Sequence, residues 1–427
     1  MEILQWIATN LLTQVAILIG LITAIGLILQ RRAFEEVVGG TLRAAIGVLI
    51  MLAGADIFVQ GLVAFQSIVA SAFRITPPQA AKTLAEFTAE RGGHAAIIMT
   101  FGFLLHLILT RLLNVRFVYL TGHLMWWVSL TVTATLLAIM PNLSTFGLIL
   151  IGTVVMALYW TLQPLYIHSY MRRVTGSDEF GYGHTSSSAA FLGALLGQFV
   201  GKPEESSEKL SPPKWLGFMK DINVSTGVVI GLIILVAAIF ADPKVLAEQA
   251  KDLNPYVWAI LQGLRFAAGI AVLLYGVRMF LAEIVPAFRG ISLTVIPGAR
   301  PALDVPVVFP YAPTAVILGF ISGTVVFLVL MVVFGALGWA TIVPPMIMLF
   351  FPGGGAGVFG NSTGGWKGAL LGGAINGLFL AVGQAITWPM LSATAPELAT
   401  LADPDWYLII WILYAIFTPL RGLFGGA

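Results

Sequence analysis

Long apolar runs separated by short polar stretches fill almost the whole chain. A run of roughly 20 apolar residues is long enough to cross the hydrocarbon core of a bilayer as a helix. The runs that fit this pattern are residues 8–29, 45–69, 95–113, 117–140, 143–167, 225–240, 257–284, 315–337, 369–390 and 406–420. With an interrupted crossing at 344–359, they predict an all-α polytopic membrane protein of about eleven transmembrane helices.

Several segments depart from this pattern. Residues 71–94 are more polar and predict an extracellular segment or a partly inserted hairpin. The apolar piece at 189–200 is too short to cross alone, so we interpret it as re-entrant or interfacial. Residues 202–223 form a polar linker that we expect in the cytoplasm. Because interrupted segments occur in both halves of the chain, we also expect an inverted repeat, which is typical of transporters.

The positions of lysine and arginine orient the predicted spans. In the eleven-span arrangement most of these residues fall on one side, which the positive-inside rule assigns to the cytoplasm. They are Arg31, Arg32, Arg111, Arg116, Arg172, Arg173, Lys202, Arg289, Arg300, Lys367 and Arg421. The N-terminus is then expected outside the cell and the C-terminus in the cytoplasm.

The composition supports the membrane assignment and excludes several kinds of chemistry. The chain is 58% hydrophobic and 10% charged, whereas a soluble domain carries about 25% charged residues. It has no cysteine, which excludes disulfides, thiolate metal sites and a cysteine nucleophile. The net charge of +2 gives no indication of a nucleic-acid partner, and none is expected. The residues 1–427 are interpreted as a single transmembrane domain.

One proline-rich stretch, Arg278–Val316, is predicted to interrupt the helical pattern. Each proline removes a backbone donor and disfavours helix just before it, and the broken part is expected at about residues 285–314. Asp304 lies there between apolar residues. An acid at membrane depth is costly and usually functional, so we expect Asp304 in the floor of a polar binding site. The alternative is a cytoplasmic loop whose prolines only make turns and whose Asp304 is solvated.

Two histidines follow small or hydroxylated residues that suit ligand binding. Thr121, Gly122 and His123 bring together a hydroxyl, a bare backbone and an imidazole, which would suit a polyhydroxylated ligand. The alternative is a lone histidine that pairs with a neighbouring helix. His184 lies at the head of GHTSSS, a Gly-rich entry to a helix whose N-terminus could hold an anion. The alternative there is an ordinary helix cap.

Other motifs carry less information about function. The segment Pro352–Gly355, followed by Asn361–Gly365, is a second predicted break or a close helix crossing through small residues. It is not a P-loop, because no GK[ST] follows the glycines. The chain has no HExxH and no carboxylates paired by spacing. No metal site and no cofactor are therefore expected.

The motifs together resemble a known family. LTGHLMW, GYGHTSSS, IPGARPALD with YAPTAVILGF, and GVFGNSTGGW occur in the order and spacing typical of the ascorbate-type membrane subunit (IIC, or EIIC) of the bacterial phosphotransferase system. The resemblance covers nearly the whole chain. The block from residue 278 to residue 320 is its most specific part.

The resemblance implies a sugar permease of the bacterial cell (inner) membrane. It implies a homodimer with a core domain that carries the sugar, a V-shaped scaffold domain that dimerises, and an elevator-type motion of the core. The implied substrate is L-ascorbate or a related small sugar acid or polyol. The implied partner is a phosphorylated IIB subunit, served by IIA. The phosphoryl-donor cysteine would belong to IIB, so whether this chain is itself an enzyme stays open.

The resemblance also assigns candidate substrate-binding residues. They are Thr121, Gly122, His123, Leu124, Met125, His184, Thr185 and Asp304. Asp304 would accept hydrogen bonds from hydroxyls of the sugar, or act as the base when phosphoryl transfer deprotonates one. A further contact that the family carries near residues 71–94 has no clear counterpart here. Three alternatives remain: a facilitator or ion-coupled symporter without IIB, an intramembrane enzyme, and a channel.

Overall fold

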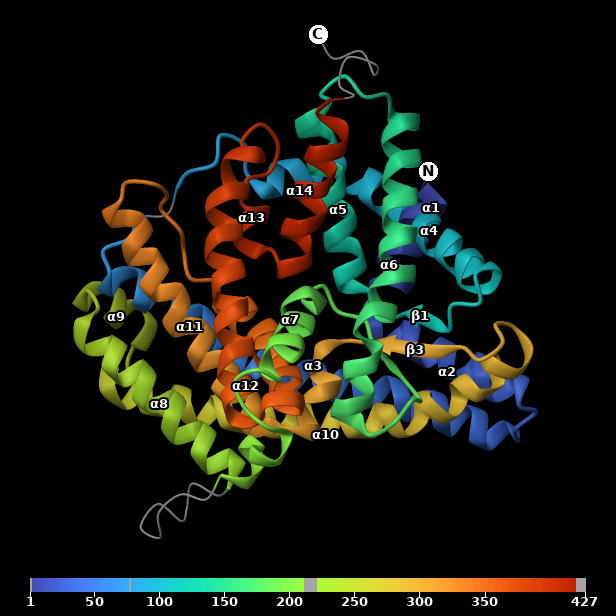
Figure 1. Ribbon diagram of the computed structural model, residues 1–427, viewed down its shortest axis with the longest axis horizontal. Helices are drawn as coiled ribbons and strands as arrows, with labels where there is room; N and C mark the ends of the chain where they lie inside the picture. The colour runs from blue at the N-terminus through green and yellow to red at the C-terminus, as the bar shows by residue number, and fades with distance from the viewer. Residues whose placement is uncertain (1, 77, 211–220, 420–427) are drawn as a thin grey trace.

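The computed structural model describes residues 2–76, 78–210 and 221–419, and these residues are almost entirely helical (Figure 1). Among them, seven helices are long and apolar enough to cross a membrane. They are α3 (Phe34–Ala72), α4 (Leu84–Leu112), α6 (Thr145–Thr175), α8 (Ile222–Phe240), α10 (Pro255–Thr294), α11 (Pro313–Ala336) and α12 (Met346–Met390). The prediction of a helical, multi-span membrane protein is confirmed.

Shorter elements complete the described chain. The apolar ones are α2 (Val15–Leu29), α5 (His123–Ile139), α7 (Ser187–Gly197) and α14 (Pro404–Phe417). The others are α1 (Glu2–Ile7), the π-helix η1 (Ala8–Leu12), α9 (Pro243–Ala250), α13 (Leu398–Leu401) and the 3₁₀ helices η2 (Pro203–Glu205), η3 (Ser207–Lys209) and η5 (Val305–Tyr311). The end of the last predicted span, with Leu420 and Arg421, lies outside the described residues.

The first predicted span, 8–29, is not one helix. It is divided into η1 and α2. The side chains of Asn10 and Thr13 donate to backbone carbonyls of Trp6 and Thr9, at 3.0 and 2.8 Å. Such local bonds compete with the regular helical pattern, which explains why an apolar run of sufficient length is interrupted here.

The predicted break at 285–314 begins too early. Helix α10 continues through Pro286 to Thr294. The adjacent helix α2 supplies hydrogen bonds there, because Gln30 Nε2 donates to the carbonyl of Pro286 at 3.0 Å. The two helices approach closely at Gly290, where a Cβ would lie 1.9 Å from the carbonyl of Gly26. Small residues thus let α2 and α10 pack closely along this part of α10.

The second predicted break is displaced. Pro352–Gly355 lies inside the first arm of α12, and the chain instead turns at Gly365, with φ 59° and ψ −152°. This backbone conformation is almost restricted to glycine. The two arms then fold back on each other, since a Cβ on Gly360 would lie 2.1 Å from the carbonyl of Gly368. The glycines of GVFGNSTGGW therefore serve helix packing and one turn.

The described part of the 202–223 linker packs on the helices. Ser207 N–H donates to Asn361 Oδ1 at 2.8 Å, and Glu208 accepts from the backbone N–H of Thr314 at 2.9 Å. Residues 211–220 lie outside the described residues. The 71–94 segment is also more regular than predicted, because α4 begins at Leu84 with a capping box formed by Thr83 and Glu86.

A small parallel sheet was missed by the all-α prediction. Its strands are β1 (Phe117–Tyr119), β2 (Gly181–Tyr182) and β3 (Arg300–Leu303), in the order β1-β3-β2. In its register, Phe117 pairs with Arg300 and Gly181 with Ala302. The central strand contains Pro301, which has no backbone N–H. The backbone groups of Arg300 and Ala302 form hydrogen bonds with the segment of β1, so Pro301 faces the other side, where β2 begins only opposite Ala302. Its missing donor would face a side without a paired strand.

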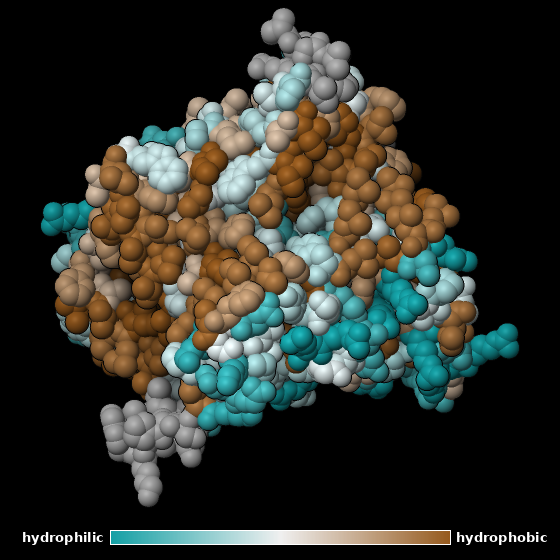
Figure 2. All heavy atoms as spheres, in the orientation of Figure 1, coloured by the Kyte–Doolittle hydropathy of each residue, from teal (hydrophilic) through white to brown (hydrophobic). Residues whose placement is uncertain are grey.

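The surface separates into apolar and polar regions. Figure 2 shows hydrophobic residues over the left and upper right of the visible face and hydrophilic residues gathered along its lower edge. The exposed apolar side chains include Leu104 of α4, Leu158 of α6 and Leu232 of α8. This distribution agrees with helices that face lipid and with polar loops at one boundary of the bilayer.

Candidate functional site

Each strand of the sheet is followed, within four residues, by one of the residues that the sequence singled out. His123 follows β1, His184 follows β2 and Asp304 follows β3. Parallel strands end at the same edge of a sheet, where ligand sites form in open α/β sheets. The sheet therefore brings together three residues that are 61 and 120 positions apart in the sequence (184 − 123 and 304 − 184).

Asp304 lies between the two histidines. Its Oδ1 is 3.5 Å from His184 Nε2, and its Oδ2 is 3.9 Å from His123 Nε2. The side chain of Asp304 is 17% exposed, and Oδ1 accepts from the backbone N–H of Val305 at 2.7 Å at the start of η5. Asp304 is thus a partly enclosed carboxylate, and the alternative of a solvated loop aspartate is wrong.

Hydrogen bonds orient the buried His184 ring. Its Nδ1 accepts from the backbone N–H of Ser186 at 3.1 Å and lies 2.8 Å from the Ser186 hydroxyl. The Tyr182 hydroxyl lies 2.9 Å from the same Ser186 oxygen. With Nδ1 as acceptor, the proton of the neutral ring lies on Nε2. His184 therefore directs an N–H donor toward Asp304.

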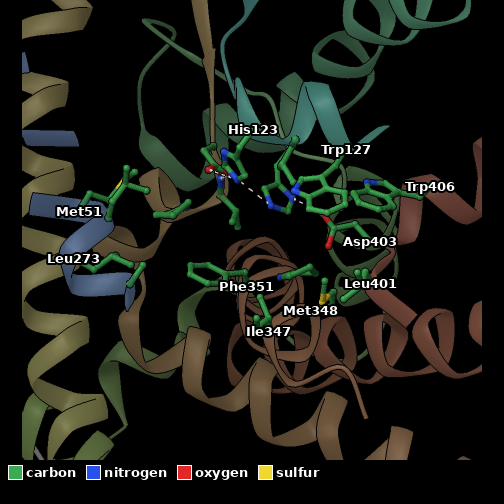
Figure 3. A pocket seen from close by; sticks show the side chains of 18 residues that line it. Met51, His123, Trp127, Leu273, Ile347, Met348, Phe351, Leu401, Asp403 and Trp406 are labelled. Atoms are coloured by element: carbon green, nitrogen blue, oxygen red, sulfur yellow. Dashed lines mark hydrogen bonds and ion pairs between the residues drawn. The ribbon is translucent and has the colours of Figure 1, made fainter. Parts of the chain in front are cut away.

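These residues line a cavity of about 310 Å³ (Figure 3). In the figure, Met51 and Leu273 come from α3 and α10 on one side, and Ile347, Met348 and Phe351 rise from α12. Trp127 and Trp406, from α5 and α14, lie next to each other on the opposite side. The cavity is thus enclosed by segments from both ends of the chain.

The polar groups of the cavity are concentrated on one wall. His123, His184, Asp304 and Asp403 all belong to the segments that follow the strands or precede α14. The residues from α3 and α10 that line the opposite wall are apolar: Met51, Leu52, Ala55 and Leu273. A ligand with several hydroxyls would therefore be held by hydrogen bonds from one side only.

Four other predicted ligand residues do not line this cavity. Thr121 and Met125 are buried, and Gly122 lies against helix η1, where a Cβ would be 2.4 Å from the carbonyl of Leu12. The hydroxyl of Thr185 is hydrogen-bonded to Asp403. Leu124 does line the cavity, beside His123. The structure thus brings together His123, Leu124, His184 and Asp304 of the predicted set.

The predicted anion site at the helix entry after His184 is already filled. Helix α7 begins at Ser187 as expected, but Asp405 occupies its N-terminus. Asp405 accepts from the backbone N–H of Ser188 at 2.8 Å and from the Ser187 hydroxyl at 2.5 Å. A carboxylate there satisfies the free N–H groups and the helix dipole, so this N-terminus serves to attach α14 to α7.

Sequence reasoning missed Asp403 and Asp405. Asp403 lines the cavity, and its Oδ2 lies 3.8 Å from His184 Nδ1. The fold thus places two carboxylates, Asp304 and Asp403, on either side of one histidine, although the sequence spacing shows no such pair. The sequence feature that could have indicated these two residues is the DPDW motif, which puts two acids at the start of an apolar helix. Acids at that depth are unusual.

Replacement of Asp405 is expected to destabilise the protein. Asp405→Ala would leave three donors without their acceptor, namely Ser187, Ser188 and the Tyr159 hydroxyl, which lies 2.7 Å from Asp405 Oδ2. We expect the free energy of unfolding to fall by roughly 3 kcal/mol, measured by thermal unfolding in detergent. Asp252→Ala, at an exposed loop position, is the control. An unchanged melting temperature for Asp405→Ala would contradict this role.

A metal-binding role has no support from the side-chain arrangement. Across the described ranges, no group of three or more His, Cys, Asp or Glu residues could hold a metal ion. The side chains that line this cavity offer imidazole donors, carboxylate acceptors and two indole rings.

A mostly helical membrane protein that holds a partly polar cavity of this kind has the features of a permease for a small hydrophilic solute. The chain belongs to the EIIC-GAT family, the sugar-specific permease components of the phosphotransferase (PTS) system, whose family model matches residues 10–405. This match confirms the resemblance of the sequence motifs to the galactitol and ascorbate type of membrane subunit.

The chain is also similar to an individual protein of known name, at low sequence identity. The chain is 27% identical over 416 residues to the ascorbate-specific PTS system EIIC component of Mycoplasma pneumoniae. The alignment covers 85% of this chain and 63% of the relative. The chain thus spans less than two thirds of the length of the protein that it matches.

Proposed function

We propose that this protein binds L-ascorbate, or a related small sugar acid or polyol, and moves it inward while a IIB partner phosphorylates it. The observation that carries the proposal is the placement of His123, His184 and Asp304 around one cavity at the edge of the parallel sheet. The family supplies the sugar-permease context. The ascorbate-specific relative favours ascorbate among the possible sugars.

The chemistry of the cavity suits ascorbate. At neutral pH ascorbate is a flat monoanion with several hydroxyls. His184 Nε2–H and His123 can donate to its oxygens, and Asp304 can accept from its hydroxyls. Its flat ring can pack against Trp127 or Trp406. A polyol would use the same carboxylate but would gain less from the histidines, since it lacks the negative charge.

A rigid-body motion of one domain past another is the proposed route of transport. The polar wall would belong to a core domain, and α3 and α10 to a V-shaped scaffold that also forms the dimer. An apolar scaffold wall would allow the core to slide without breaking hydrogen bonds to the sugar. The proposed arrangement has eleven crossings (6 + 2 + 3). They are the six other long helices, the two arms of α12, and the shorter helices α2, α5 and α14. The N-terminus would then lie outside the cell and the C-terminus in the cytoplasm.

Phosphoryl transfer is the proposed driving step. A phosphocysteine of IIB would give its phosphoryl group to a hydroxyl of the sugar, because this chain has no cysteine of its own. The S–P bond breaks, an O–P bond forms, the thiolate stays on IIB, and the hydroxyl proton passes to the Asp304 carboxylate. The phosphorylated sugar cannot rebind from the cytoplasm, which makes the uptake directional.

The test is uptake of radiolabelled ascorbate into vesicles that contain this protein. With phosphoenolpyruvate, the general PTS proteins, IIA and IIB supplied inside, we expect labelled ascorbate phosphate to accumulate. Galactitol and other polyols serve as competitors. Uptake of unmodified ascorbate driven by a cation gradient, without IIB, would instead favour a facilitator or an ion-coupled symporter of the same fold.

Filling the cavity from the scaffold side should block binding. Ala55 lines the cavity on α3, so in Ala55→Trp an indole would occupy the space of the sugar. We expect binding of ascorbate to weaken by about 10- to 100-fold, measured by isothermal titration calorimetry. Ala53→Trp, at an exposed position of the same helix, is the control and should bind normally. Normal affinity in Ala55→Trp would place the sugar elsewhere.

A further inference from the structure

A second hollow, the arginine groove, lies at the opposite end of strand β3 from the cavity. It has a volume of about 880 Å³. One wall is the face of α10 between Arg278 and Ser292, and the other is formed by the residues around Glu179 and the turn that leads into Arg300. Neither the site described above nor sugar transport accounts for its composition.

Positive charge predominates in this groove. Its lining includes Arg32, Arg278, Arg289 and Arg300 against a single carboxylate, Glu179. Asp178 neutralises Arg300, at 2.6 Å from its guanidinium. Arg278 and Arg289, by contrast, form no ion pair with an acidic side chain within 4 Å among the described residues. The groove thus holds two exposed guanidinium groups that are available to an anion.

The floor between these two arginines is apolar. Arg278 and Arg289 are eleven residues apart, so they lie on one face of α10, about 16 Å apart along its axis. The side chains between them on this face include Leu281, Val285 and Phe288. Farther along the same helix end, Leu293 and Val295 are 72% and 51% exposed. A ligand of this groove would need a negative group and an apolar body.

We infer that the arginine groove binds an anionic phospholipid, whose negative headgroup is attracted by the positive charge of the two arginines and whose acyl chains lie along the apolar floor. Guanidinium groups bind phosphate oxygens through paired N–H donors. Basic pockets between membrane helices favour lipid headgroups of this kind. A soluble phosphate ion would gain nothing from Leu281, Val285 or Phe288, which is why the apolar floor favours a lipid.

The groove and the cavity lie at the two ends of one strand. Strand β3 begins at Arg300 in the groove and ends next to Asp304 in the cavity. The backbone of β3 is held from both sides, by β1 and by β2.

The test compares lipid binding to three purified proteins by native mass spectrometry in detergent. The probes are phosphatidylglycerol and phosphatidylcholine with identical acyl chains. We expect the wild-type protein to retain phosphatidylglycerol in preference to phosphatidylcholine. Arg278→Gln with Arg289→Gln should weaken this retention by about 30-fold, since each arginine contributes roughly a factor of five toward an anionic lipid. Arg173→Gln, an exposed arginine outside the groove, should change it by less than about twofold.

A second variant tests whether the acyl chains of the lipid contact the apolar floor of the groove. Val285→Glu leaves both arginines in place and puts a carboxylate where the acyl chains would lie, so it should also lose phosphatidylglycerol. Equal retention of both lipids, or an equal loss in Arg173→Gln, would overturn the inference. So would saturable binding of inorganic phosphate without lipid binding. Loss of affinity for a phosphorylated IIB protein in the double variant, with lipid binding unchanged, would make the groove a docking surface for that protein instead.

Discussion

Asp304→Asn is expected to reduce the binding of ascorbate by about 30-fold or more, because it replaces the partly enclosed carboxylate that is the proposed acceptor for the sugar hydroxyls, and loss of a charged hydrogen-bond partner costs about 2 kcal/mol or more. The amide has the same shape and can still accept from the backbone N–H of Val305. It cannot present a negative oxygen to both His184 and His123. The measurement is isothermal titration calorimetry with the purified protein.

The controls separate binding from folding. Asp252→Asn changes an exposed loop aspartate and should bind ascorbate normally. The Asp304→Asn protein should keep the elution volume of the wild-type protein in size-exclusion chromatography. His123→Ala should also lose binding, but by a smaller factor, because its ring is 43% exposed and 3.9 Å from Asp304. Normal affinity for ascorbate in both Asp304→Asn and His123→Ala would show that this cavity is not the sugar-binding site.

Gly365→Ala is expected to destabilise the protein strongly. The φ and ψ of Gly365 strongly disfavour any residue with a Cβ, and a Cβ would lie 2.4 Å from the carbonyl of Glu205. Strain and clash together should lower the free energy of unfolding by roughly 3 kcal/mol. Thermal unfolding in detergent measures this change.

The matched control is Gly335→Ala on α11. A Cβ there meets nothing within 4 Å among the described residues, so its melting temperature should stay within about 2 °C of the wild type, since surface substitutions rarely change stability by more than 0.5 kcal/mol. If Gly365→Ala melts like this control, the turn between the two arms of α12 does not depend on glycine.

The helical layout could be predicted from the sequence because it depends on local quantities. An apolar run of the length of α11 or α4 can only be satisfied in a membrane as a helix, and its position follows directly from hydropathy. The breaks were harder to predict. Helix α10 continues past Pro286, where it packs closely against Gly26 and Gln30, and hydropathy along the chain does not show such a contact. Gly365, rather than Pro352, makes the turn for the same reason: contacts from distant segments decide which of several glycines and prolines bends.

The candidate site was only partly predictable. Asp304, His123 and His184 could be found because polar residues within apolar sequence are conspicuous. The sheet that gathers them could not, since strands of two to four residues carry no period long enough to recognise. Asp403 was missed because it lies at the entrance of a helix, where an acid has an ordinary capping explanation. Only the fold shows that it lies beside His184.

The three short strands also limit how such a chain can change over evolution. Each strand is bound to its neighbours through backbone atoms, so its side chains can vary while the pairing persists. The spacing cannot vary as freely: one residue inserted between β3 and Asp304 would displace that carboxylate by about 3.3 Å, which is the rise of a single strand residue. Insertions and deletions should therefore accumulate in the outer loops and be purged from the few positions that separate each strand from its histidine or aspartate.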